Sequence, residues 1–434
     1  MGILDLFHSI GCIKKERNRK MKGVITTCGC IVLFCLRMTA VEGSDWTKWR
    51  GPYGNGISPE KNWNPDAFDR GIKILWDINV GMGHSSAAVK GSRVYTMGNR
   101  RIIAGSDTNY VDIVWCVDAK TGREIWRYSY PCREGLDPGP GSSPVLDDSH
   151  LYTISREGHM YCFDAENGRI IWMRNVISDS LALDNGWGFS CSPVIDGNRL
   201  ILNANESGIA FDKRTGKLLW NSGKAETWFS TAVLMNINQK RMAVFPTQDT
   251  VHAVNLETGK VHWSFPWGQN SCADPIIIGN KMMLTGPGNA LLELSKDEPT
   301  VLWENKRSRS SFQSWVIMGD NAYGFGSQRR KEPFRCVDIN TGEMKWEQDI
   351  GNMGAVIAAN GKLIILTKNG RIIIAEATAE GYKEISNAQI VSMADNTGIN
   401  NRRQCHCWIN PVLSDGRLYA RNTYGNLVCV DLRN

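Results

Sequence analysis

Short apolar runs bounded by Gly, Asn and Asp recur along most of the chain, with a period of roughly 45 residues. Each unit indicates four strands, with a tight Thr-Gly turn before the last one. Five units share, with small variations, the frame D-x-x-T-G-x-x-x-W: Asp118–Trp126, Asp164–Trp172, Asp212–Trp220, Asn255–Trp263 and Asp338–Trp346. This pattern is typical of a propeller blade and excludes a helical solenoid.

Three further copies complete the series. Ser295–Trp303 lacks the glycine, and Ala377–Ile385 keeps Gly381 but lacks the Trp. The last copy is split, because the chain ends in the half-motif Cys429–Leu432 while Ile74–Trp76 supplies an isolated second half. We therefore predict an all-β, eight-bladed propeller of four-stranded antiparallel blades, closed by one blade that the two ends of the chain share.

The motif residues have separate physical roles. Asp can bond the backbone of its own turn, and Gly supplies the positive φ that a tight hairpin needs. The Trp ring is large enough to wedge between neighbouring blades. Seven tryptophans are predicted to have this structural role: Trp76, Trp126, Trp172, Trp220, Trp263, Trp303 and Trp346.

The N-terminus resembles a secretory signal. A basic stretch from Lys14 to Lys22 precedes an apolar run, Val24–Leu36, that is too short for a membrane-spanning helix. We predict a signal peptide at 1–43, with Met21 as an alternative start, a lead-in at 44–73 and the propeller at 74–434. The protein is expected to be exported, periplasmic or secreted, without a transmembrane anchor. Lipidation is less favoured, because the early cysteines lie inside the apolar run.

The net charge limits the class of partner that the protein is expected to bind. The formal net charge is +6, but the first 43 residues hold seven Lys/Arg and three Asp/Glu, so the remainder is near neutral. Such a chain lacks the electrostatic footprint of a nucleic-acid-binding protein. We expect no nucleic acid partner, a protein or peptide partner, and a monomer.

The motif, with a small residue two places before its Asp (Ala210, Ala253, Cys116, Cys162), resembles the pyrroloquinoline-quinone-like propeller repeat family over roughly Trp46 to Asn434. The opening Trp46–Pro52 resembles the lead-in of a bacterial exported subgroup. The family includes quinoprotein alcohol dehydrogenases, which use the quinone with calcium, and the propeller lipoprotein of the outer-membrane β-barrel assembly machinery. Function must therefore be argued from a site.

The residues give little support for catalysis. The dehydrogenases place a disulfide of adjacent cysteines over the quinone, whereas the nearest feature here is Cys405-His406-Cys407. There is no haem-attachment motif, and Asp274 and Glu206 are the only acids expected near the channel. We assign no catalytic residues and no metal, and we expect no cofactor. A pyrroloquinoline-quinone-dependent dehydrogenase with calcium is the alternative.

Nine cysteines follow the predicted signal peptide. Cys116, Cys162, Cys336 and Cys429 occupy the small position two residues before the motif Asp, as Ala375 is expected to do in its own blade. The other five lie in connections between blades: Cys132, Cys191, Cys272, Cys405 and Cys407. They are either scattered small residues or, with His406 and His84, a disulfide or soft-metal site.

Aromatic and polar residues are predicted to collect at one mouth of the channel, where they would line a groove or plug the channel. These candidates are His84, Trp187, Phe189, Trp228, Phe229, Asn270, Phe312, Trp315, His406 and Trp408. The sequence thus favours a non-enzymatic exported scaffold that presents the mouth to a protein, peptide or small ligand.

Overall fold

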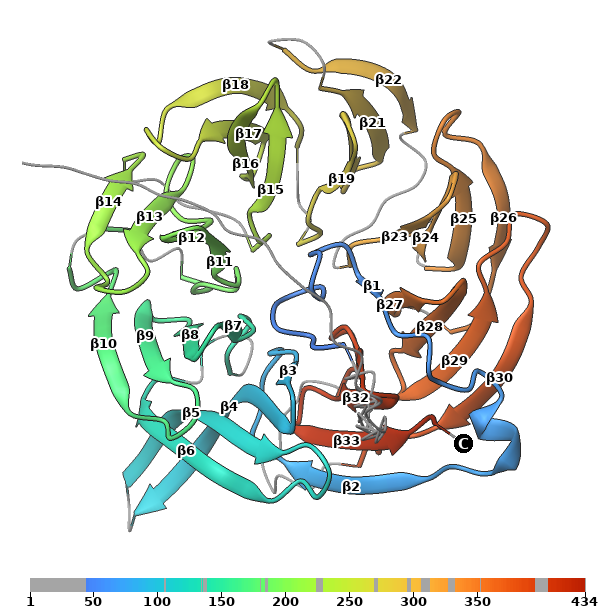
Figure 1. Ribbon diagram of the computed structural model, residues 1–434, viewed down its shortest axis with the longest axis horizontal. Helices are drawn as coiled ribbons and strands as arrows, with labels where there is room; N and C mark the ends of the chain where they lie inside the picture. The colour runs from blue at the N-terminus through green and yellow to red at the C-terminus, as the bar shows by residue number, and fades with distance from the viewer. Residues whose placement is uncertain are drawn as a thin grey trace, which may run out of the picture. The chain divides into compact units, whose positions relative to one another are not determined.

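The repeats form eight antiparallel sheets arranged around a common centre in the computed structural model (Figure 1). The structure describes residues 44–433 except 105–106, 134, 136–138, 180, 184–185, 224–228, 269–271, 295–297, 306–312, 327–331, 352 and 395–404. The predicted signal peptide at 1–43 therefore lies outside the described residues. The predicted fold class, an eight-bladed all-β propeller, is confirmed.

Each blade runs from an inner to an outer strand, and we number the blades along the chain. Blade 1 contains β3 (Ala88–Lys90), β4 (Arg93–Ala104), β5 (Asp107–Asp118) and β6 (Glu124–Pro131). Blade 2 contains β7 (Val145–Asp147), β8 (His150–Ile154), β9 (His159–Asp164) and β10 (Ile170–Asn175). Blade 3 contains β11 (Val194–Asp196), β12 (Arg199–Leu202), β13 (Ile209–Asp212) and β14 (Leu218–Asn221). Blade 4 contains β15 (Val233–Ile237), β16 (Lys240–Pro246), β17 (Thr250–Asn255) and β18 (Val261–Pro266).

The second half of the ring continues this order. Blade 5 contains β19 (Ile276–Ile278), β20 (Lys281–Thr285), β21 (Asn289–Glu293) and β22 (Thr300–Asn305). Blade 6 contains β23 (Val316–Met318), β24 (Asn321–Phe325), β25 (Phe334–Asp338) and β26 (Met344–Gln348). Blade 7 contains β27 (Gly354–Ala359), β28 (Lys362–Thr367), β29 (Arg371–Glu376) and β30 (Glu384–Gln389), with β1 (Ile57–Ser58) added parallel to β27.

Blade 8 closes the ring with strands from both ends of the chain. Its inner strands are β31 (Val412–Ser414), β32 (Arg417–Arg421) and β33 (Asn426–Asp431), and its outer strand is β2 (Ile74–Asn79). β2 pairs antiparallel with β33, and Trp76 lies opposite Cys429. The predicted shared blade is confirmed, and this pairing removes the open sheet edge that a linear array of blades would leave.

The repeat motif joins each blade to the one before it. In blade 1 the Asp118 carboxylate accepts hydrogen bonds from the Thr121 amide at 2.8 Å and the Thr121 hydroxyl at 2.7 Å. Gly122 has a φ of 69°, and a Cβ there would come within 2.8 Å of the Trp76 ring, so only glycine fits. Trp76 Nε1 donates to the carbonyl of Ala119 at 3.0 Å.

The same tryptophan contact recurs around the ring. Nε1 donates to the backbone carbonyl of the next blade from Trp126 to Ala165, Trp172 to Lys213, Trp220 to Leu256, Trp303 to Ile339 and Trp346 to Thr378. Cross-strand neighbours leave room for the ring: the predicted small residues Cys116, Cys162, Cys336 and Ala210 lie opposite Trp126, Trp172, Trp346 and Trp220. A large outer side chain is thus matched by a small inner one.

Two motif copies have longer turns than we predicted. In blade 7 Glu376 takes the Asp position, and Ser386 takes the Trp position opposite Ile374. The frame predicted at Ala377–Ile385 is therefore wrong by one residue at each end, and Ile374, not Ala375, fills the position opposite the motif Trp. In blade 5 Glu293 pairs with Lys281 as the motif Asp does elsewhere, so the predicted start at Ser295 is also displaced.

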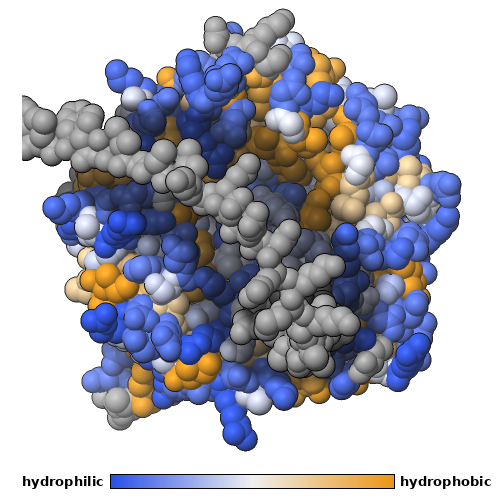
Figure 2. All heavy atoms as spheres, viewed as in Figure 1, coloured by the Kyte–Doolittle hydropathy of each residue, from blue (hydrophilic) through white to orange (hydrophobic). Residues whose placement is uncertain are grey.

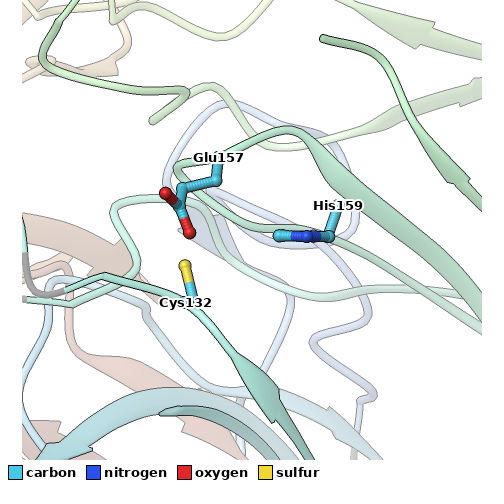
Figure 3. A group of neighbouring side chains, drawn as sticks. All are labelled: Cys132, Glu157 and His159. Carbon is cyan, nitrogen blue, oxygen red and sulfur yellow. The ribbon is translucent and has the colours of Figure 1, made fainter. Parts of the chain in front are cut away.

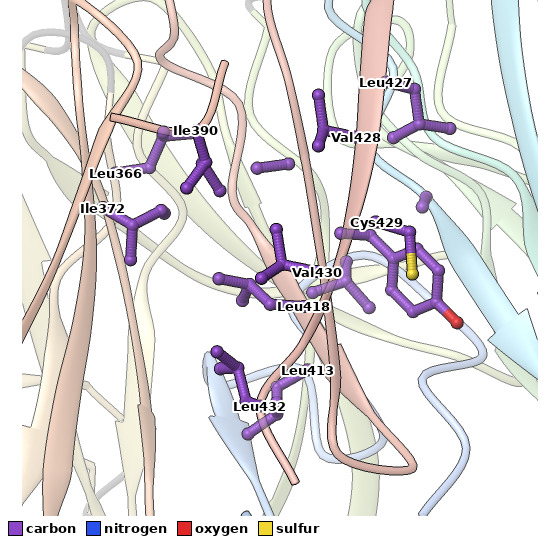
Figure 4. Close-up of a cluster of buried hydrophobic side chains, with 14 of the residues drawn as sticks. Leu366, Ile372, Ile390, Leu413, Leu418, Leu427, Val428, Cys429, Val430 and Leu432 are labelled. Atoms are coloured by element: carbon purple, nitrogen blue, oxygen red, sulfur yellow. The ribbon is translucent and has the colours of Figure 1, made fainter. Parts of the chain in front are cut away.

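The lead-in fills the place of the missing tryptophan between blades 7 and 8. Ser386 Oγ donates to the carbonyl of Pro65 at 2.5 Å, and the Asn64 amide donates to Leu432 O at 2.6 Å. The short helix η1 (Ala67–Arg70) contacts β30. Trp63 and Phe68 are buried in the apolar cluster of blades 7, 8 and 1, part of which is shown in Figure 4.

Among the described residues no helix is long and apolar enough to cross a membrane.

Candidate functional site

A belt of hydrogen bonds runs from blade 1 to blade 6 at one end of the channel, just before the inner strands. The residue at this position in one blade donates its backbone N–H to the side chain at the same position in the next. The donor and acceptor pairs are Ser86 to Ser143, Ser143 to Ser192, Ser192 to Thr231, Thr231 to Asp274, and Asp274 to Ser314. Strands within a blade alternate in direction. The connections between blades and the turns between the second and third strands of each blade therefore lie at this same end of the channel. We call this end the connection face.

The lead-in occupies the centre of the ring (Figure 1). Trp46 pairs with Val89 in blade 1, and the Thr47 carbonyl accepts from the Leu146 amide in blade 2. The Gly56 carbonyl then accepts from the Ala358 amide in blade 7, and Ser58 Oγ donates to the Leu413 carbonyl in blade 8. Residues 44–60, which we call the plug, thus bond to inner strands on several sides of the channel.

The middle of the plug reaches the belt through Trp49, and it carries the buried Arg50 guanidinium beside it. Trp49 Nε1 donates to Asp274 Oδ2 at 2.7 Å, and Arg50 Nη2 donates to the Trp315 carbonyl at 2.6 Å. Burial raises the pKa of Asp274, and the positive charge of Arg50 and the Trp49 hydrogen bond oppose that rise. Burial lowers the pKa of Arg50 to about 10, and the Asp274 charge counteracts this.

These residues do not fit a quinone and its calcium ion in the channel. Asp274, the acid of the belt, already uses both oxygens, one on the Thr231 amide and one on Trp49. The plug backbone crosses the middle of the ring (Figure 1), and its Trp46 and Arg50 side chains are buried, at 1% and 2% exposed. Glu206, the other acid expected here, lies elsewhere, near the β14 end of blade 3, where it approaches Gly223.

Three of the predicted mouth residues meet at the connection face. The His406 and Trp408 rings are 4.7 Å apart between centroids and perpendicular, and His84 lies 6.0 Å from Trp408. Gln313 Nε2 donates to the Trp408 carbonyl, which ties this group to blade 6. His84, His406 and Trp408 are each partly exposed.

The other predicted mouth residues are dispersed. Trp187 is 49% exposed, and Phe229 is partly exposed. Phe189 is buried among the side chains of blades 2 and 3, and Trp315 is fully buried between blades 5 and 6. Trp228, Asn270 and Phe312 lie outside the described residues.

The disulfide considered from the sequence does not form. None of the nine cysteines among the described residues is disulfide-bonded, and Cys407 Sγ instead contacts Met393 Sδ at 3.8 Å. Burial raises the pKa of the Cys191 thiol to about 12. The buried cysteines pack as small apolar groups.

A different constellation joins blades 1 and 2 at the connection face (Figure 3). Cys132, which follows β6, lies beside Glu157 of the β8–β9 turn and His159 at the start of β9, and their ligand atoms are all within 4.8 Å of one another. In the described part of the chain this is the one such group of His, Cys, Asp or Glu. Sequence reasoning missed it, because the repeat motif gives no signal for which connections meet across a blade boundary.

Blade 1 also carries an arm. β4 and β5 have 12 residues each, whereas the matching strands of the other blades are much shorter, so their ends extend beyond the sheet (Figure 1). Ile102 and Ile103 near the tip are 46% and 65% exposed. The arm base joins the cluster, because Asn99 Nδ2 donates to the Cys132 carbonyl at 3.1 Å.

Comparison with known proteins agrees with this architecture. The family model described as outer membrane protein assembly factor BamB matches residues 111–246 and 209–323. Outer membrane protein assembly factor BamB of Yersinia pestis is 21% identical over 328 residues, which cover 71% of this chain and 75% of that protein. The chain is a propeller of the pyrroloquinoline-quinone-like repeat family.

Two solved structures show how widely this repeat family shares the fold. BamB from Moraxella catarrhalis has a TM-score of 0.59 at 14% identity, covering 83% of this chain and 99% of that one. A quinohemoprotein alcohol dehydrogenase from Pseudomonas putida has a TM-score of 0.61 at 12% identity, covering 90% and 80%. At these identities the likeness to either structure shows the fold alone.

Proposed function

We propose that this protein is an exported, non-enzymatic scaffold that binds another protein through its connection face. The filled channel carries this proposal. The plug bonds to inner strands of several blades, and its Trp46 and Arg50 side chains are buried there, which leaves the outer surfaces for recognition. The predicted signal peptide and the similarity to outer membrane assembly factors support a periplasmic location.

The partner surface extends over blades 1 to 3. The arm tip exposes Ile102 and Ile103, and Trp187 exposes its ring beyond the β8–β9 turn. Arg156 of that turn donates to the Trp187 carbonyl at 2.6 Å, so the two segments are fixed together. The rim of the ring is mostly hydrophilic and carries several apolar patches, as Figure 2 shows for one face. Exposed apolar side chains at a polar rim are typical of protein-binding surfaces.

Site-specific crosslinking in cells tests this surface. A photo-crosslinking amino acid at Ile103 should capture one defined envelope protein on irradiation. The matched control is Met173 on the outer strand β10, which is also 65% exposed but lies away from the connection face. Capture from Met173 with none from Ile103 would place the binding surface elsewhere and refute the proposal.

The alternative, a quinone-dependent dehydrogenase, is tested on the purified protein. Titration with pyrroloquinoline quinone and calcium, followed by calorimetry, should show no saturable binding, because the plug occupies the axis. Saturable binding with alcohol-dependent dye reduction would overturn the scaffold proposal.

A further inference from the structure

The group Cys132, Glu157 and His159 offers three different metal-binding atoms at one point. Figure 3 shows the Glu157 carboxylate turned toward the Cys132 sulfur, with the His159 ring beside them on β9. In a tetrahedral zinc site, bonds of about 2.0 to 2.3 Å place ligand atoms roughly 3.5 Å apart. The three ligand atoms, within 4.8 Å of one another, therefore need to converge by only about 1 Å.

The surroundings prepare the ligands in the way that metal sites require. His159 contacts Ser155 Oγ at 3.0 Å through one ring nitrogen, which holds the orientation of the ring. Cys132 is 2% exposed, so the charge of the metal ion itself has to stabilise its thiolate.

A fourth side chain, the carboxylate of Asp112 on β5, lies next to Cys132. Asp112 is fully buried, and its Oδ1 accepts from Asn99 Nδ2 at 2.7 Å. The Cys132 thiol and the Tyr130 hydroxyl also hydrogen-bond this carboxylate, so Asp112 links the cysteine to β5. A fully buried carboxylate is costly when it is ionised, and a nearby cation stabilises it.

One protein cation now occupies the mouth of this group. The Arg133 guanidinium pairs with Glu157, and the Arg133 amide donates to Glu157 Oε2 at 3.1 Å. The Arg133 side chain is 79% exposed, so it can leave the carboxylate without loss of packing. Arg156, the other nearby cation, is held by the Trp187 carbonyl.

We propose that Cys132, Glu157 and His159 bind a divalent transition-metal ion, with zinc as the best match to this mixed sulfur, nitrogen and oxygen set. The ion displaces Arg133 from Glu157, and the thiol proton of Cys132 passes into solvent. It joins blade 1 to blade 2 at the base of the arm. The site is structural, since it stabilises one blade boundary, and it fixes the arm relative to the connection face.

Titration of the purified protein with Co²⁺ and Zn²⁺ tests the site. Wild-type protein should bind one equivalent of Co²⁺ with a thiolate-to-cobalt charge-transfer band, and Zn²⁺ should displace it and raise the Tm. Cys132→Ser and His159→Gln should each weaken binding by about 100-fold or more. Arg133→Ala should bind at least as tightly as wild type, because a competing cation has been removed.

The control is Cys272→Ser, which removes a partly exposed thiol in a different blade connection and should keep the band. Circular dichroism checks that each variant is folded. If Cys132→Ser does not fold, Glu157→Gln provides the same test, because that side chain is partly exposed. Absence of the band in wild type, or its persistence in Cys132→Ser, would overturn the proposal.

Discussion

At the scale of the residue, the glycine of the repeat motif serves two purposes. Gly168 has a φ of 74°, and a Cβ there would lie 2.7 Å from ring carbons of Trp126. The glycine thus permits both the left-handed turn and the close stacking of the tryptophan from the preceding blade. Gly197, in the β11–β12 turn, has a φ of 58°, but a Cβ there would meet nothing within 4 Å, so it serves the first purpose alone.

Comparison of Gly168→Ala with Gly197→Ala separates the two effects. The left-handed backbone should lower the free energy of unfolding by about 1 kcal/mol in both variants. Gly168→Ala should lose about 1 to 3 kcal/mol more, because its methyl group overpacks the Trp126 ring. Urea unfolding followed by tryptophan fluorescence measures both values. Equal losses would mean that the stacked ring moves aside freely.

At the scale of the element, the plug behaves as an internal part of the ring. Trp46 pairs with the inner strand of blade 1. Its ring packs against Gly51, where a Cβ would come within 3.1 Å of the ring atoms. The lead-in continues through β1 to the position between blades 7 and 8 where Ser386 replaces the motif tryptophan. One segment therefore stabilises both the channel and the weakest motif copy.

The plug gives a direct stability prediction. Trp46→Ala should lower the free energy of unfolding by about 3 to 5 kcal/mol, since a fully buried ring is removed. Tyr53→Ala in the same segment should change it by less than about 0.5 kcal/mol, because Tyr53 is 68% exposed. Thermal unfolding measures both. A small effect of Trp46→Ala would show that the channel does not depend on the plug.

At the scale of the whole molecule, closure depends on the terminal strands. β33 is paired with β2 on one side and β32 on the other, and Asp431 at its end bonds Lys73 and Arg433. Hydrogen bonds from Arg433, with a smaller contribution from Lys73, hold the pKa of Asp431 well below its usual range. The last strand thus links the two ends of the chain by backbone pairing and by charge.

Removal of residues 426–434 should abolish cooperative unfolding and lead to aggregation, because it exposes the edges of β2 and β32. Removal of residues 433–434 alone should cost only about 1 to 2 kcal/mol, because Arg433 is partly exposed and Lys73 still pairs with Asp431. Calorimetry and size-exclusion chromatography measure both outcomes. Cooperative melting of the longer truncation would show that the ring does not need its eighth blade closed.

The sequence by itself determined the blade count, the Asp-Gly-Trp turns and the shared last blade, because the motif acts locally and repeats at a nearly constant spacing. It misplaced the copy at Ala377–Ile385, where a longer turn shifts the frame. There the small Ser386 takes the position of the motif tryptophan, and the large Ile374 takes the small position opposite it. Only the tertiary structure decided that the lead-in fills the channel, since residues 44–60 repeat nothing in the chain. It also brought Cys132 to Glu157 and His159, because that contact depends on how two neighbouring blades meet.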